Sequence, residues 1–158
     1  MFKFVTIGTF DNAINIPTCK LADSVSVPVV DGMGVTVDRA KEELALTTAT
    51  TGKGDVYILY NESAVLDGLN RNAFVKGDMP LVFRAASLTG YEIAVSVDDA
   101  HFDSTKAQVQ AGKLLGYGDG GKLGVISAAT GYAVWFKVIE VSGGIARAEV
   151  LTALPTSA

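Results

Sequence analysis

The chain has 158 residues, 13 of them basic and 17 acidic, with a formal net charge of −4. It contains no run of lysine and arginine, and because nucleic-acid binders normally carry a basic patch, that class is disfavoured. No apolar run approaches the about 20 residues that span a bilayer, and no signal peptide follows Met1, so we expect neither a membrane partner nor secretion.

Glycine is abundant and only 19% of the residues are charged, which favours short strands joined by tight turns. The single cysteine, Cys19, excludes an internal disulfide and is typical of a protein that matures in a reducing cytosol. An intermolecular bridge through Cys19 stays open. A chain of this length buries enough surface to fold without a metal or a disulfide.

Apolar runs bounded by Gly, Pro, Asn and Asp predict about ten short strands. In chain order these runs are Phe2–Ile7, Ser24–Val30, Val35–Asp38, Lys41–Ala49, Asp55–Tyr60, Leu81–Arg84, Tyr91–Val97, Gly112–Tyr117, Lys122–Ile126 and the two arms of Tyr132–Leu151. Pro28 makes Ser24–Val30 an edge strand or ends it early. Lys41–Ala49 also fits one helical turn, but its alternation favours a strand. The best helix candidate is Glu62–Leu69 with Asn61 as N-cap, and a second helical turn is expected after Ser104.

This pattern predicts an all-β fold, a short-stranded β-barrel or β-sandwich with at most one or two short helices. Three segments are expected. They are an N-terminal strand or arm at 1–20, an N-terminal β-subdomain at 21–70 and a C-terminal β-domain at 71–158, which can pack as one unit.

Tyr132–Leu151 predicts a β-hairpin, because Gly143-Gly144 suits a two-residue turn in which both central residues have positive φ. A three-residue loop is the alternative. The two-residue register pairs Glu140 with Arg147, Val141 with Ala146, Ile139 with Ala148 and Phe136 with Leu151. It predicts one apolar face made of Ala133, Trp135, Ile139, Val141, Ala146, Ala148 and Val150, in which Lys137 does not fit.

The stretch Gly116–Leu123 matches the glycine spacing of phosphate-binding loops, but Leu123 stands where the Mg²⁺-binding hydroxyl belongs. A strand follows it, whereas such loops open a helix. We therefore predict a hairpin turn here and no nucleotide cofactor.

Asp98, Asp99, His101 and Asp103 form the densest cluster of potential metal ligands. Their spacing lacks the glycine and the distal Glu of a Ca²⁺ loop, and a lone histidine makes a poor transition-metal site. A solvated acidic loop is the favoured interpretation, and whether Asp98–Asp103 binds a cation stays open.

No pattern of residues predicts catalysis. A nucleophilic pair requires Cys19 with His101, nothing but Lys20 activates Cys19, and no serine lies in a G-x-S-x-G elbow. The paired Glu42-Glu43 belongs to a charged segment that is more simply a solvated surface. We expect a protein that is not an enzyme, with no catalytic, cofactor or metal residues. Trp135 and the tyrosines suit a sugar platform, but in alternating strands they are more often core.

The layout resembles the capsid decoration (cement or head-stabilisation) proteins of tailed bacteriophages. The residues that carry this resemblance are Val29–Asp38, Val56–Asn61, Phe74–Asp78, Ala111–Leu115 with Gly120–Leu123, and the final hairpin. The resemblance covers most of the chain.

The resemblance implies a virion structural protein that binds the outer surface of a capsid and bridges neighbouring major capsid proteins. Such proteins occur as trimers or as monomers at capsomer centres, so a homotrimer and a monomer both stay open. The protein would be made in the bacterial cytoplasm and end on the capsid exterior. The alternatives are another phage structural role, such as a head-fibre base or tail protein, and a carbohydrate-binding or adhesin module.

The apolar N-terminal segment predicts the contact with a partner, by strand addition or apolar anchoring. The expected contact residues are Phe2, Phe4, Phe10, Ile14 and Ile16. The alternative is an ordinary first strand followed by a loop.

Overall fold

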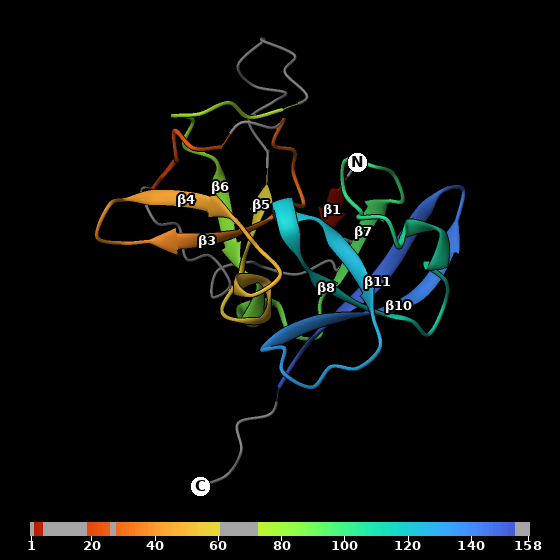
Figure 1. The fold of residues 1–158 in the computed structure, drawn as a ribbon. Helices are drawn as coiled ribbons and strands as arrows, with labels where there is room; N and C mark the ends of the chain where they lie inside the picture. Colours follow the sequence, from red (N-terminus) through yellow and green to blue (C-terminus); the bar gives the residue numbers. More distant parts are fainter. Residues whose placement is uncertain (1, 5–18, 26–27, 61–72, 154–158) are drawn as a thin grey trace, which may run out of the picture.

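The computed structural model describes residues 2–4, 19–25, 28–60 and 73–153, and within these ranges the chain folds into two β-sheets (Figure 1). The predicted all-β class is confirmed. The helical segments of the described part are short 3-10 turns: η1 (Thr51–Lys53), η3 (Ala85–Leu88), η4 (Lys106–Gln108) and η5 (Asp119–Gly121). None of its helices is long and apolar enough to cross a bilayer.

The larger sheet has six strands, and all its neighbouring strands are antiparallel. Across the sheet the order is β1 (Phe2–Phe4), β7 (Glu92–Ser96), β11 (Ile145–Thr152), β10 (Val134–Ser142), β8 (Leu114–Tyr117) and β9 (Leu123–Ile126). The predicted hairpins β8–β9 and β10–β11 are both present.

The smaller sheet has five strands, in the order β2 (Lys20–Leu21), β4 (Glu43–Leu46), β3 (Gly34–Asp38), β5 (Tyr57–Tyr60) and β6 (Leu81–Arg84). The segment Lys41–Ala49 thus contains a strand, as its alternation predicts. Of the described residues in Ser24–Val30, only Val29 pairs, through one bridge to Phe74. The helix expected at Glu62–Leu69 lies outside the described residues.

The sheets do not follow the expected segments 1–20, 21–70 and 71–158 one to one. β1 belongs to the larger sheet, whereas β6, which falls in the third segment, completes the smaller one. The division of the chain into subdomains therefore stays a prediction.

In β5 and β6 the smaller sheet contributes side chains to two cores, because successive strand residues point to opposite sides. Ile58 and Phe83 belong to the core shared with the larger sheet, together with Phe136 and Val138. Their neighbours in the sequence, such as Leu59, point to a second core on the other side of the sheet. Cys19, Val29 and Met33 also belong to this second core.

A β-bulge at Ile139 corrects the predicted register of the β10–β11 hairpin. Glu140 pairs with Arg147 and Val141 with Ala146, as predicted, but Val138 and not Ile139 faces Ala148. The extra residue reverses the faces of β10 before the bulge, and the predicted pairing of Phe136 with Leu151 is wrong for the same reason: Phe136 faces Val150.

The apolar face of the hairpin therefore differs from the predicted one. Its buried residues are Val134, Phe136, Val138, Ala146, Ala148 and Val150. Ala133 and Ile139 are exposed, Trp135 is half-buried, and Lys137 points to solvent. A prediction that assumes strict alternation along the strand cannot locate a bulged residue. The charged Lys137 on the predicted apolar face was the indication that the alternation is interrupted.

The β8–β9 hairpin joins the two sheets. The Tyr117 hydroxyl donates a hydrogen bond of 2.7 Å to the Gly32 carbonyl, and the Thr47 hydroxyl donates one of 2.8 Å to the Gly118 carbonyl. A Cβ at Gly34 would lie 2.6 Å from the Tyr117 ring, so only glycine allows this approach.

Candidate functional site

The residues of the acidic loop each have a local structural partner. Asp98 accepts hydrogen bonds from the main-chain N–H groups of Ala100 and His101, both 3.0 Å, and its Oδ1 lies 2.7 Å from Nδ1 of His101. Partial burial acts to raise the pKa of the Asp98 carboxyl, but the hydrogen bonds from His101 and Ala100 outweigh it and lower that pKa below its usual value.

The other two carboxylates of this loop point elsewhere. Asp99 pairs with Lys106, and Asp103 accepts hydrogen bonds from the main-chain N–H (2.7 Å) and the hydroxyl (2.6 Å) of Thr105. Within the described ranges, no three Asp, Glu, His or Cys side chains converge on one point. Nε2 of the buried His101 has no hydrogen-bond partner in this part of the chain.

The glycine-rich stretch Gly116–Leu123 is the turn of the β8–β9 hairpin, as predicted. Gly120 and Gly121 have φ of 67° and 72°, and the Asp119 carboxylate accepts a hydrogen bond of 2.6 Å from the Ala49 main chain. Lys122, the lysine of the motif, donates to the Asp99 carbonyl.

Cys19 and His101 belong to different parts of the fold. Cys19 lies in the second core, where burial raises the pKa of its thiol, and Glu42 adds to this effect. His101 lies in the loop that follows β7. The structure does not bring the two together.

Of the expected partner-contact residues, Phe2 is buried between the sheets and pairs with Val95 in β7. It contributes to packing in this structure. The Phe4 main chain pairs with Ile93, while Phe10, Ile14 and Ile16 lie outside the described residues, so their role as contacts stays a prediction.

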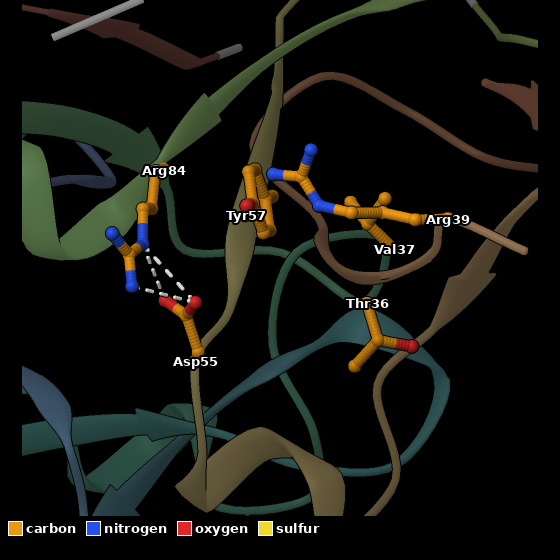
Figure 2. A pocket seen from close by; sticks show the side chains of 6 residues that line it. All are labelled: Thr36, Val37, Arg39, Asp55, Tyr57 and Arg84. Atoms are coloured by element: carbon orange, nitrogen blue, oxygen red, sulfur yellow. Dashed lines mark hydrogen bonds and ion pairs between the residues drawn. The ribbon is translucent and has the colours of Figure 1, made fainter. Parts of the chain in front are cut away.

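A notch of about 310 Å³ opens in the smaller sheet where two neighbouring strands part, and we call it the β3–β5 notch (Figure 2). Its lining residues are Thr36, Val37, Arg39, Asp55, Tyr57 and Arg84. β3 pairs with β5 only at Gly34 and Val35, although it continues along β4 to Asp38. The notch is the space left when β3 turns away from β5.

Two guanidinium groups reach this notch, but only one of them is neutralised by a described neighbour. Arg84 holds Asp55 through Nε, 2.9 Å and 3.1 Å from the two carboxylate oxygens, and through an ion pair of 2.9 Å from Nη2. The hydrogen bond and the charge of Asp55 raise the pKa of Arg84 further. Arg39 makes no ion pair within the described residues, so the lining carries one uncompensated positive charge.

Tyr57 forms the inner wall of the notch. The residue is only 5% exposed, and no described residue makes a hydrogen bond to its hydroxyl. In the view of Figure 2 this hydroxyl lies between the guanidinium groups of Arg39 and Arg84. The ring is therefore largely buried, while the hydroxyl keeps contact with solvent at the notch.

A second hollow, of about 490 Å³, lies beside the β8–β9 hairpin, and we call it the hairpin groove. Its polar side chains are those of Lys53, Asp103, Ser104, Asp119 and Tyr132. The Lys53 ammonium lies 5.7 Å from the centre of the Tyr132 ring, while the same ring packs so closely on Gly116 that a Cβ there would lie 2.5 Å away.

Sequence reasoning missed the β3–β5 notch. Arg39 belongs to the charged segment interpreted as a solvated surface, and Asp55 and Arg84 bound predicted strands. The sequence contains part of the signal for the ion pair. An acid at the start of one strand and a base at the end of another suggest a cross-strand pair once the two strands are known to be neighbours.

No protein-family model matches the chain, and neither a curated protein nor a solved structure is significantly similar to it.

Proposed function

We propose that this protein is a non-enzymatic virion component that binds the outer surface of a phage capsid and stabilises the contacts between major capsid proteins. The proposal rests on the sequence resemblance to decoration proteins together with the distribution of apolar side chains on the surface.

The observation that carries the proposal is a pair of separate exposed apolar spots. Val75 and Met79, 52% and 64% exposed, lie in the segment before β6, and Ile139 and Val141, 38% and 39% exposed, lie on the β10–β11 hairpin. Figure 1 shows that segment at the upper left of the molecule and the hairpin tip at its right. A protein that bridges two neighbours needs two such contact surfaces.

The edge of β10 adds a mode of contact at the second spot. β8 pairs with β10 at Phe136 and Lys137, and the loop at Gly112 and Lys113 extends this contact to Val138. From Ile139 to Ser142, no described residue other than those of β11 makes a main-chain hydrogen bond to β10. Such an open edge accepts an added strand.

Contacts of this kind stabilise the assembled shell by mass action. A protein that binds only the mature lattice lowers the free energy of that lattice in proportion to RT ln(1 + [L]/Kd), where L is the free decoration protein. No catalytic group is needed for this mechanism.

The experiment that tests the proposal is density-gradient fractionation of lysate from the native source, followed by mass spectrometry. The proposal expects this chain to sediment with virus-sized particles in a fixed ratio to the shell protein. If it stays with free proteins while particles are abundant, the capsid role is wrong.

The hairpin groove favours a second candidate, a carbohydrate-binding module. Two carboxylates, an ammonium and a phenol around one hollow suit a ligand rich in hydroxyl groups. Glycan-array binding that is lost in Asp119→Asn but kept in Trp135→Ala would favour this candidate and place the site in the groove. Absence of glycan binding by the folded protein would remove it.

A further inference from the structure

We propose that the β3–β5 notch is a binding site for a carboxylate side chain, Asp or Glu, carried on an extended segment of a partner protein. This inference goes beyond the capsid role and does not depend on it, because it follows from the donors that converge in the notch.

The first argument is charge. Arg39 and Arg84 bring two positive charges to the notch, and Asp55 supplies one negative charge, which Arg84 holds with Nε and Nη2. The remaining charge is that of Arg39, on a chain whose net charge is −4. A planar guanidinium without a partner fits a carboxylate with two parallel hydrogen bonds.

The second argument is the hydroxyl of Tyr57. No described residue makes a hydrogen bond to this hydroxyl, and its oxygen keeps contact with solvent, although the residue as a whole is only 5% exposed. The phenol lines the notch beside Arg39, so an acceptor bound there meets an O–H donor as well as a guanidinium. This pairing of donors favours an anionic oxygen.

The third argument is the main chain of β3. Leu59 N–H donates to the Met33 carbonyl, so the odd-numbered residues of this segment direct their hydrogen-bonding groups toward β5. Val37 continues this series two residues after Val35, where pairing with β5 ends. Its N–H and C=O therefore point into the notch, ready for a peptide in extended conformation.

Together these groups specify the ligand. The Val37 main chain pairs with the main chain of an extended segment, and Arg39 and Tyr57 hold the carboxylate of one side chain. A free small anion satisfies only the second part, so the two sources of anionic oxygen are distinguishable.

The test is a titration of the ¹⁵N-labelled protein with the capped peptide Ac-Thr-Val-Glu-Val-Thr-NH2, followed by two-dimensional NMR. The proposal expects shifts of the Val37 amide and the Arg39 Nε–H signals. Arg39→Gln should weaken binding about fivefold, the effect of losing one partly solvated ion pair. Tyr57→Phe should weaken it as well.

Lys41→Gln is the matched control, because Lys41 is an exposed cation two residues away and its described ion-pair partner is Asp38, outside the notch. It should bind the peptide as the unchanged protein does. The counterpart peptide with Gln in place of Glu should bind more weakly, and added salt should weaken the Glu peptide only.

Three outcomes would overturn the proposal. One is the absence of shifts at these signals at millimolar peptide. Another is that the protein binds the Glu and Gln peptides with equal affinity, or that Arg39→Gln binds the Glu peptide as tightly as the unchanged protein does. The same spectra verify that the variant is folded. The third is that sodium acetate or inorganic phosphate reproduces all the shifts at the same concentration, which would make the notch a small-anion site only.

Discussion

Tyr117 is the largest fully buried side chain among the described residues, and it holds the two sheets together. Its ring packs edge-on against Phe136 with centroids 5.5 Å apart, and its hydroxyl donates to the Gly32 carbonyl. Burial raises the pKa of this phenol far above its usual value, because the anion loses its hydration. Tyr117 therefore keeps its proton in the folded protein at pH values where an exposed tyrosine ionises.

This burial predicts a specific alkaline loss of stability. In the unfolded chain Tyr117 loses its proton above about pH 10, whereas in the folded protein it keeps it, so the free energy of unfolding falls as pH rises beyond that value. The expected slope from this residue is about 1.4 kcal/mol per pH unit. Below about pH 10 the contribution is fully present.

Urea unfolding of the protein and of Tyr117→Phe, between about pH 9 and about pH 11, measures this effect. At neutral pH the variant should be less stable by about 1–2 kcal/mol, because the Gly32 carbonyl loses its donor. At high pH the difference between the two proteins should shrink. Parallel curves would show that the hydroxyl is not buried as described.

Asp98 predicts the opposite dependence at low pH. Hydrogen bonds from His101 and Ala100 lower the pKa of its carboxyl, so its contribution is present above about pH 4, the usual value, and is lost as pH falls through the lowered value. Asp98→Asn should lower the melting temperature at pH 7 more than at about pH 3. Asp99→Asn is the control, since an exposed ion pair with Lys106 contributes little.

At the scale of elements, the described strands were predictable because short alternating apolar runs between turn residues favour strands over helices. The bulge at Ile139 was not, because it changes neither the composition nor the turn of the hairpin. Its origin lies in packing: Phe136 and Val138 fill the core between the sheets, while Glu140 must stay outside to meet Arg147, 3.0 Å away. One extra residue satisfies both demands.

The bulge therefore predicts an unusual tolerance to deletion. Without Ile139, Val138 still faces Ala148 and Glu140 still faces Arg147, so the β10–β11 ladder becomes regular and no buried residue is lost. The deletion should change the free energy of unfolding by less than about 1 kcal/mol, as for an exposed position. Chemical denaturation measures it.

Deletion of Ala94 is the matched control, because β7 pairs on both sides without a bulge. Removing one residue there moves every later side chain of β7 to the wrong face, and the variant should not fold. Comparable stability of the two deletions would mean that the register of this sheet is not specified by its apolar faces.

The β3–β5 notch was beyond sequence reasoning for a reason of the same kind. Asp55 and Arg84 are 29 positions apart and meet only because Tyr57 pairs with Arg84 across β5 and β6. Arg39 joins them because β3 leaves β5 after Val35. Local composition reveals neither the pairing of β5 with β6 nor the point at which β3 separates from β5. It does reveal the two-residue turn at Gly143 and Gly144, whose φ values are 57° and 74°.

At the scale of the whole molecule, the two exposed apolar spots lie on different sheets. Met79 leads into β6 of the smaller sheet, and Val141 lies on β10 of the larger one. The packed core and the Tyr117 anchor join these sheets, so the spots are held at a set separation. A bridging protein gains from such rigidity, because the second contact then forms at a high effective concentration.

This geometry predicts how attachment to particles depends on each spot. The paired substitutions Val75→Ser with Met79→Ser, and Ile139→Ser with Val141→Ser, should each change the free energy of unfolding by no more than about 1 kcal/mol, since all four side chains are exposed. Each pair should nevertheless remove most of the binding to purified particles, measured by co-sedimentation. The loss of either contact abolishes the gain from two-point attachment, so the fourfold variant should bind little less than either pair.

The control is Ser127→Ala with Ala128→Ser, which exchanges two exposed residues near the end of β9 and should leave binding unchanged. If only one pair matters, the protein attaches by a single surface and does not bridge. If neither matters while the protein still co-sediments, the apolar spots are not the contacts, and the N-terminal residues Phe10, Ile14 and Ile16 become the next positions to substitute. Two-point attachment thus makes a quantitative claim that single-surface binding cannot reproduce: two distant, stability-neutral changes with equal and non-additive effects.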